Sequence, residues 1–342
     1  MEILKVFFGK RGDGIWQIQS LKPIALDPED GCQADFYKVK DDLFVGDIPF
    51  IGTIRSIMGQ SIVPIVANVP GESVLRCLGT GFFVSCTGLM LTAAHIITNP
   101  IERKYGGVRE LDDQTWQLGE LKMGVMVPTN PLNGFQGYVF RSMEWAGFLA
   151  ERTDSPLPIE GVNLKLTSDT AICKIEPLAT DVPYQPLAIV QRGIQGLGMR
   201  VGKSATAVGY AGMKDVELTQ SNESLVIGDF QFNLHVARGA ILEQFPDNSR
   251  TRRASSPGAC FSASLKLPPG MSGSPIFDDE RIYVHGVVSK GLEDETGIAN
   301  FGYGSMLASV LALPIKQMES RSLLDMQHSH DQGIPIVNIP DA

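Results

Sequence analysis

Short runs of apolar and β-branched residues, separated by Gly, Pro, Asn and Asp, dominate the chain from residue 61 onward. Runs of roughly four to eight such residues between turn residues are typical of β-strands. The turn Cys86-Thr87-Gly88 joins two of these runs into a predicted hairpin. The pattern therefore predicts a first block of strands at residues 62–66, 81–85, 89–92, 115–118, 122–127, 137–141 and 171–175.

A second strand-rich block follows a predicted connector at residues 183–195. Residues 304–313 have the apolar spacing of a helix. Two strand-rich blocks predict two hydrophobic cores, which agrees with a length of 342 residues, more than one core usually supports. The predicted strands of the second block are residues 204–208, 225–227, 230–236 and 259–265, and a hairpin that joins 276–277 to 281–289.

The two ends of the chain lie outside these blocks. Residues 3–8 and 15–18 predict a hairpin, and the last apolar residues, 334–340, predict a frayed terminus or a peptide that adds a strand to a sheet edge; we favour the frayed terminus. The expected divisions are an N-terminal accessory element at 1–50, a first core at 51–182, a second core at 183–315 and a C-terminal extension at 316–342.

Composition and charge narrow the classes of partner and compartment. The formal net charge of −9 argues against a nucleic acid recognised through its phosphates. The N-terminus does not resemble a signal peptide and no run of about 18 apolar residues occurs, so we expect no membrane contact. The five cysteines are scattered, without the spacing of metal ligands. Together these features predict a cytoplasmic protein with reduced thiols.

Three residues supply the side chains that a hydroxyl nucleophile needs. His95 follows an apolar strand, Asp169 opens the predicted buried strand 171–175, and Ser272 lies in a glycine-flanked turn. An imidazole can remove the serine proton, and a carboxylate behind it fixes its tautomer and stabilises its cation. We therefore predict a catalytic triad of these residues. The other aspartates between His95 and Ser272 that we considered are Asp112, Asp113, Asp154 and Asp181, none of which opens a buried strand.

The turn around the serine also offers donors for a developing oxyanion. The backbone N–H groups of Gly270 and Ser272 are the predicted pair, since Gly270 can adopt a backbone conformation that other residues resist.

Four segments resemble the trypsin-like, chymotrypsin-fold serine proteases, in the family's order. The resemblance spans about residues 60–315 and implies an all-β fold of two antiparallel six-stranded β-barrels, with the active site in the cleft between them. It implies no metal or organic cofactor. The four segments are Gly79 to Val84 leading to Thr92-Ala93-Ala94-His95, Asp169 to Ile172, Gly270 to Pro275, and Val287 to Gly291.

Two departures make the chain more similar to HtrA-type and glutamyl-endopeptidase-like members than to digestive enzymes. Members activated by proteolysis carry an aspartate immediately before the serine, where this chain has Met271. Secreted members usually carry a cysteine after the histidine, where this chain has Ile96. The resemblance therefore predicts that activation does not depend on a newly freed N-terminus.

The resemblance also implies substrate-binding residues. Ser289 would hydrogen-bond Asp169, and Ser289, Lys290 and Gly291 would pair with an extended substrate backbone. The specificity pocket would be walled by residues 266–269, 289–291 and 301–304. Lys266 would either favour acidic side chains or point from the rim into solvent.

The sequence thus predicts a cytoplasmic serine endopeptidase that hydrolyses protein or peptide substrates through an acyl-enzyme on Ser272. The appended ends predict control by a regulatory protein partner or an upstream signal. The alternative function is a catalytically silent, protease-like module that binds peptides.

Overall fold

The protein is seen here in a computed structural model. It describes residues 2–8, 17–18, 25–26, 61–69, 71–103, 108–112, 115–118, 121–129, 137–153, 163–177, 183–192, 199–220, 226–227, 233–246, 248–278, 283–293, 299–327 and 334–339.

The first barrel contains six antiparallel strands and a core rich in branched and aromatic side chains. The strands are ordered β11-β6-β5-β4-β9-β10, and pairing between β10 and β11 closes the barrel. Phe82, Phe148 and Ile172 are fully buried in its core. The strands are β4 (Ile62–Asn68), β5 (Val74–Phe83), β6 (Leu89–Thr92), β9 (Lys122–Thr129), β10 (Gly137–Thr153) and β11 (Asn163–Ile175).

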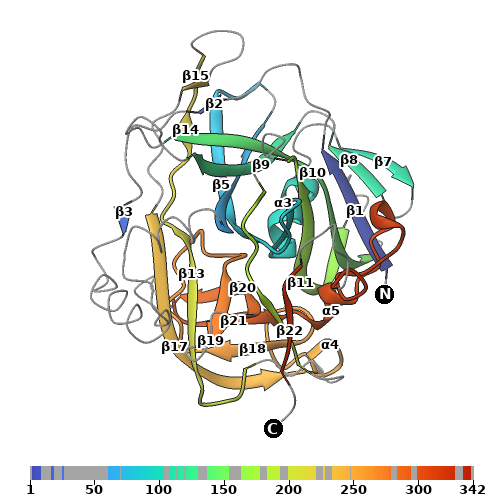
Figure 1. The fold of residues 1–342 in the computed structure, drawn as a ribbon, viewed down its shortest axis with the longest axis vertical. Coiled ribbons are helices and arrows are strands. Elements are labelled where there is room, and N and C mark those ends of the chain that lie inside the picture. The colour runs from blue at the N-terminus through green and yellow to red at the C-terminus, as the bar shows by residue number, and fades with distance from the viewer. Residues whose placement is uncertain are drawn as a thin grey trace.

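The second barrel repeats this arrangement with the order β19-β13-β17-β18-β21-β20, closed by pairing between β19 and β20. Figure 1 shows its yellow-to-red strands below those of the first barrel. The expected fold of two six-stranded antiparallel barrels is confirmed. The strands are β13 (Ser204–Ala211), β17 (Asn233–Phe245), β18 (Cys260–Ala263), β19 (Pro275–Asp278), β20 (Val284–Glu293) and β21 (Ala299–Met306).

Helices are short in the described part of the chain, and none is long and apolar enough to cross a membrane. The prediction of a helix over 304–313 was wrong in its first half, because residues 304–306 belong to β21 and pair with β18 and β20. The helical segments are α3 (Ala94–Glu102), α4 (Asn248–Thr251), α5 (Ala308–Leu311) and the 3₁₀ turn η1 (Lys316–Met318).

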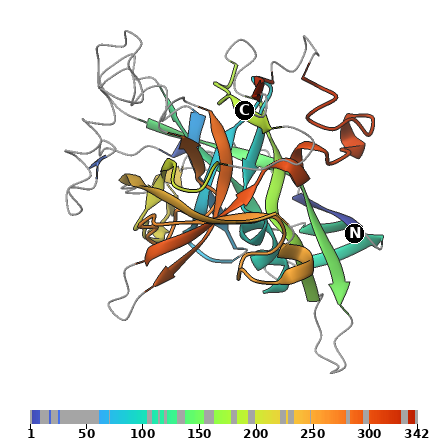
Figure 2. The ribbon, with the colours of Figure 1, turned by 90° about the horizontal axis from the view of Figure 1, so that it is seen from below.

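The first strands of the chain join the barrel sheets. β1 (Glu2–Phe8) lies between β10 and β8 (Thr115–Leu118), and β8 also pairs with β7 (Val108–Asp112). Figure 2 shows β1 in blue beside the N label. Since both edges of β1 are occupied, the predicted hairpin with β2 (Gln17–Ile18) was wrong, and β2 pairs with β10 instead. The turn predicted at residues 9–14 lies outside the described residues.

Four two-residue strands complete the described N-terminal and central parts of the chain. β3 (Ala25–Leu26) pairs with β17, and β14 (Val216–Glu217) pairs with β5 of the first barrel. β15 (Thr219–Gln220) pairs with β16 (Val226–Ile227).

The C-terminal segment is packed onto the barrels. β22 (Ile336–Ile339) pairs in parallel with β12 (Ile189–Arg192), and Gln327 Nε2 donates to the carbonyl of Ile336 at 2.9 Å. Leu323 and Met326 are fully buried in the large core cluster. The predicted frayed terminus was therefore wrong, and strand addition to a sheet edge occurs within the chain itself.

Candidate active site

His95 and Asp169 are brought together by neighbouring strands of the first barrel. β11 pairs with β6 so that Ala171 lies opposite Thr92, and α3 begins directly after β6. The buried residues Ala93 and Ala94 leave room for this close approach. Asp169 lies inside β11, so the expectation that it opens its strand was wrong. Asp112 ends β7, and Asp113, Asp154 and Asp181 lie outside the described residues.

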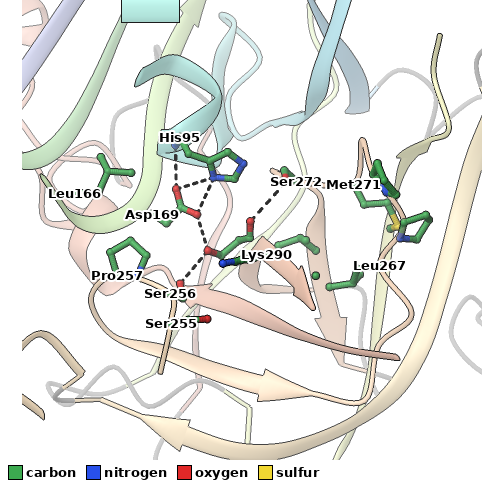
Figure 3. Close-up of a pocket in the computed structure, with 15 residues that line it drawn as sticks. His95, Leu166, Asp169, Ser255, Ser256, Pro257, Leu267, Met271, Ser272 and Lys290 are labelled. Atoms are coloured by element: carbon green, nitrogen blue, oxygen red, sulfur yellow. Dashed lines mark hydrogen bonds and ion pairs between the residues drawn. The ribbon is translucent and has the colours of Figure 1, made fainter. Parts of the chain in front are cut away.

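The Asp169 carboxylate accepts hydrogen bonds from two groups of His95. Nδ1 of the imidazole lies 2.9 Å from Oδ2 and 3.1 Å from Oδ1, and the backbone amide of His95 donates to Oδ1 at 3.0 Å (Figure 3). The aspartate side chain is 3% exposed, while that of His95 is 30% exposed. The imidazole can therefore reach a substrate while its carboxylate partner is shielded from water.

The electrostatics of this pair follow from burial and mutual attraction. Burial alone lowers the pKa of His95, but the charge and hydrogen bond of Asp169 and the charge of Glu102 outweigh it and the opposing charge of Lys290. The pKa of His95 is therefore raised above its ordinary value. Burial likewise raises the pKa of Asp169, but His95 and the Ser289 hydroxyl reverse this and hold the pKa below its ordinary value.

Ser289 on β20 donates its hydroxyl to Asp169 Oδ2 at 2.5 Å, as the resemblance implied. This bond crosses between the barrels, since Asp169 lies in β11 of the first barrel.

Ser272 lies in a turn of the second barrel that the first barrel holds from behind. Its carbonyl accepts from the amide of Thr80 at 2.8 Å, and the Thr80 hydroxyl donates to the carbonyl of Gly270 at 3.1 Å. Gly270 and Gly273 have φ angles of +98° and +86°, which L side chains rarely adopt. A Cβ on Gly273 would also lie 2.0 Å from the carbonyl oxygen of Thr80. The two glycines therefore give the turn its shape.

The Ser272 hydroxyl donates to the carbonyl oxygen of Ser289 at 3.5 Å, and within the described residues no hydrogen bond joins it to His95. Rotation about the Cα–Cβ bond of Ser272 is the movement available to bring its hydroxyl toward the imidazole. Catalytic hydrogen bonds are often loose before substrate binds.

The turn leaves two backbone donors unused. Among the described residues, the amides of Gly270 and Ser272 donate no hydrogen bond, whereas the amides of Met271, Gly273 and Ser274 all do. Two free N–H groups in the turn that carries the serine are what an oxyanion site requires.

A pocket of about 460 Å³ connects these groups. His95, Asp169 and Ser272 all line it, together with the predicted substrate-binding residues at 289–291. Lys266 is partly buried and is not among the described residues that line the pocket. Residues 301–304 do not line it either. The apolar part of the wall is formed by Leu166, Pro257, Leu267, Pro268, Pro269, Met271 and Val288.

Sequence reasoning missed a loop that contributes Ser255, Ser256 and Pro257 to the pocket. The loop precedes β18, and the Asn248 side chain bonds to its backbone. A cluster of Ser, Pro and Gly in the sequence signals a loop, but no local pattern shows that the loop reaches a strand nearly 90 residues earlier.

Comparison with known proteins agrees with this geometry. A profile of the trypsin-like peptidase domain matches residues 79–287, more than half of the chain. The chain belongs to this family. Trypsin-like peptidases are serine proteases that act on peptides or proteins. The resemblance to this family that the sequence indicated is therefore confirmed. No curated protein matches the chain.

Solved structures with similarity to this trypsin-like peptidase include Deg5, at 15% sequence identity over 76% of this chain and 89% of that one, with a TM-score of 0.45. The active form of the Rv3671c protease from M. tuberculosis is 17% identical over 89% of this chain and 91% of its own, with a TM-score of 0.41. The HtrA-type protease AlgW with a decapeptide is 13% identical over 75% of this chain and 63% of its own, with a TM-score of 0.39.

Proposed function

We propose that this trypsin-like peptidase is an active serine endopeptidase that cleaves its substrates through an acyl-enzyme on Ser272. The observation that carries the proposal is the His95–Asp169 pair, joined by hydrogen bonds from the imidazole and from the backbone amide of His95. This pair lines one pocket with Ser272, whose turn also has two free backbone amides. Such a pair keeps the Nε2 atom of the imidazole available as a base.

In the proposed reaction, His95 Nε2 takes the proton of the Ser272 hydroxyl as Oγ attacks the scissile carbonyl carbon. The amides of Gly270 and Ser272 donate to the resulting oxyanion. His95 then gives the proton to the leaving amine, and an ester remains on Ser272. A water molecule, deprotonated by His95, hydrolyses the ester and restores the serine. Asp169 remains ionised and stabilises the imidazolium at both stages.

The substrate would bind as an extended strand along residues 289–291. Pairing of β20 with β19 ends at Val287, so the following residues have no partner from β19, and they line the pocket. A substrate amide that donates to the Ser289 carbonyl would replace the Ser272 hydroxyl there and release it toward His95. The apolar wall at Leu267 and Val288 favours an apolar side chain next to the cleaved bond.

A fluorophosphonate probe tests the proposal, because it labels only a serine that its own site activates. We expect labelling of the wild type and none of Ser272→Ala. Ser274→Ala is the matched control, since Ser274 is a buried serine of the same turn whose hydroxyl has no hydrogen-bond partner among the described residues. Absence of labelling in the folded wild type would contradict the proposal.

A second candidate is a peptide-binding module that does not cut. The observation that favours it is the Ser272 hydroxyl, which bonds to Ser289 rather than to His95. One experiment distinguishes the two functions. A binding module would bind peptides from a proteome-derived library without producing fragments, whereas the protease would cleave them next to apolar residues.

We also propose a cytoplasmic protease whose activity a protein partner controls. The four described cysteines are free thiols, as expected in a reducing compartment. Cleavage of generic peptides at the same rate with and without cellular extract would contradict control by a partner.

A further inference from the structure

A chain of buried hydroxyl groups extends from Asp169 into the second barrel. Ser289 donates to Asp169 Oδ2 at 2.5 Å, and Ser256 Oγ lies 2.9 Å from Ser289 Oγ. Figure 3 draws both bonds as dashed lines below Asp169. Ser256 is 1% exposed and Ser289 is 2% exposed, so water does not compete for these hydroxyls.

The chemistry of the groups fixes the direction of the chain. An ionised carboxylate only accepts hydrogen bonds, so the single proton of Ser289 points to Asp169. A lone pair of Ser289 Oγ then accepts the proton of Ser256, since Ser289 Oγ lies nearer to Ser256 Oγ than Ser305 Oγ does, at 2.9 Å against 3.5 Å. Successive donors of this kind polarise one another and strengthen the bond to the charge at the end of the chain.

The loop that carries Ser256 is held in place from two sides. The Asn248 amide donates to the carbonyls of Ala254 at 3.2 Å and Ser256 at 2.6 Å, and its oxygen accepts from the amide of Ala254 at 2.8 Å. Gly258 has a φ of +71°, and a Cβ there would lie 2.3 Å from the carbonyl oxygen of Thr167. The loop is therefore packed directly against β11, two residues before Asp169.

We propose that Ser256 is a positioning residue of the active site: its hydroxyl orients the Ser289 hydroxyl and, through it, the carboxylate that orients His95. The inference rests on the proposed function of His95, Asp169 and Ser272. It adds a residue that acts on the reacting atoms only through Ser289 and Asp169, although its loop, in the opposite barrel, also lines the pocket.

The chain of donors has a measurable consequence for protonation. A donor directed at the His95–Asp169 pair stabilises its less protonated form, so removing the donor raises the pH at which the pair takes up a proton. Glu102 on α3 and Lys290 on β20 also act on His95, and a substitution at Ser256 leaves both in place.

Steady-state kinetics of Ser256→Ala against pH test the proposal. We expect kcat to fall about three- to tenfold, the worth of one neutral hydrogen bond, with KM unchanged. We expect the acid limb of the profile of kcat/KM to move to higher pH. Ser256→Thr keeps a hydroxyl, so the acid limb of its kcat/KM profile should lie at the same pH as in the wild type. The matched control is Ser262→Ala, which removes an equally buried serine hydroxyl from β18 and should leave the limb unchanged.

A second measurement does not depend on turnover. NMR titration of the His95 imidazole in a Ser272→Ala background should give a higher apparent pKa when Ser256→Ala is added. If Ser256→Ala does not fold, Ser256→Cys preserves the volume and retains only a weak donor. The inference is overturned if the folded variant keeps the wild-type titration, or if Ser262→Ala shifts it equally. Failure of the proposed function is a different result, in which the wild type itself neither cleaves peptides nor reacts with the probe.

Discussion

The Asp169 carboxylate shows how single residues compensate for burial. It is almost fully removed from water, yet its pKa stays below the ordinary value because His95 and Ser289 surround it with donors and positive charge. His95 is stabilised as a cation by the charge and hydrogen bond of Asp169 and by the charge of Glu102. Each partner thus favours the charged form of the other, and the pair titrates as a unit.

This coupling predicts opposite pH dependences for activity and stability. Because the folded pKa of His95 is raised, its protonated form stabilises the fold at pH values below its unfolded pKa of about 6.5, and this contribution is lost as pH rises through the folded pKa. The proposed reaction requires the neutral imidazole, so kcat/KM should rise over the same interval. Steady-state kinetics across pH measures kcat/KM, and urea unfolding across pH measures the free energy of unfolding.

His95→Ala supplies the comparison for stability. Its free energy of unfolding should lack the fall that the wild type shows as pH rises above about 6.5. Asp169 behaves in the opposite sense, because its lowered pKa gives stability that is present above its unfolded pKa of about 3.9 and is lost as pH falls through the folded pKa. Parallel stability curves for the wild type and His95→Ala above pH 6 would refute the coupling.

Met271 gives a second prediction at the residue scale. It is fully buried in the core of the second barrel, where relatives activated by proteolysis carry an aspartate. Met271→Asp places a carboxylate in this apolar cluster and should lower the free energy of unfolding by about 3 kcal/mol or more. Met271→Leu preserves the volume and should cost less than about 1.5 kcal/mol. Chemical denaturation compares the two, and equal losses would contradict the argument.

At the scale of elements, local patterns located the strands but not their full lengths. The bounds of β6 and β8 were predicted correctly: Gly88 precedes β6 and α3 follows it directly, while Asp113 and Gly119 flank β8. β10 was predicted over 137–141 and extends to Thr153. It pairs along its length with β9, β11, β1 and β2, and these ladders compensate for weak strand formers such as Gly147.

In the candidate site, too, some residues were predictable from local sequence patterns and others were not. His95, Asp169, Ser272 and the glycine turn were predicted from short motifs because each chemical role needs a particular residue type in a particular local setting. No short motif could identify Ser256, because its proposed role depends on a contact with Ser289, 33 positions away in the sequence. Lys266 has a suitable charge and position in the sequence, but the pocket wall is formed by Leu267 instead.

The loop before β18 gives a prediction at this scale. Asn248→Ala removes three hydrogen bonds that hold the loop and should lower the free energy of unfolding by about 1–3 kcal/mol. Because Ser256 moves with the loop, kcat should fall as well. Ser264→Ala, which removes a hydroxyl bonded to the exposed backbone of Ala240, is the control and should leave kcat unchanged. An Asn248→Ala protein with wild-type kcat would show that the position of the loop does not affect the active site.

At the scale of the whole molecule, the proposed active site depends on how the two barrels are joined. The first supplies His95 and Asp169, and the second supplies Ser272 and Ser289. Thr80 of β5 links them behind the pocket: its amide donates to the Ser272 carbonyl, and its hydroxyl donates to the Gly270 carbonyl and accepts from the Tyr210 amide at 3.0 Å. One buried residue thus fixes the turn that carries Ser272 relative to His95.

Thr80→Val tests this link, because it replaces the hydroxyl by a methyl group of similar size. The Gly270 carbonyl and the Tyr210 amide would lose their bonds to the first barrel, and the serine turn could shift relative to His95. We expect kcat to fall about tenfold or more, since a displacement near 1 Å can cost up to about a hundredfold. Thr92→Val removes a hydroxyl whose bond, to the Thr80 carbonyl at 2.7 Å, stays within the first barrel. It should cost similar stability with a smaller loss of kcat, and equal kinetic losses in the two variants would show that the link between barrels does not position the serine.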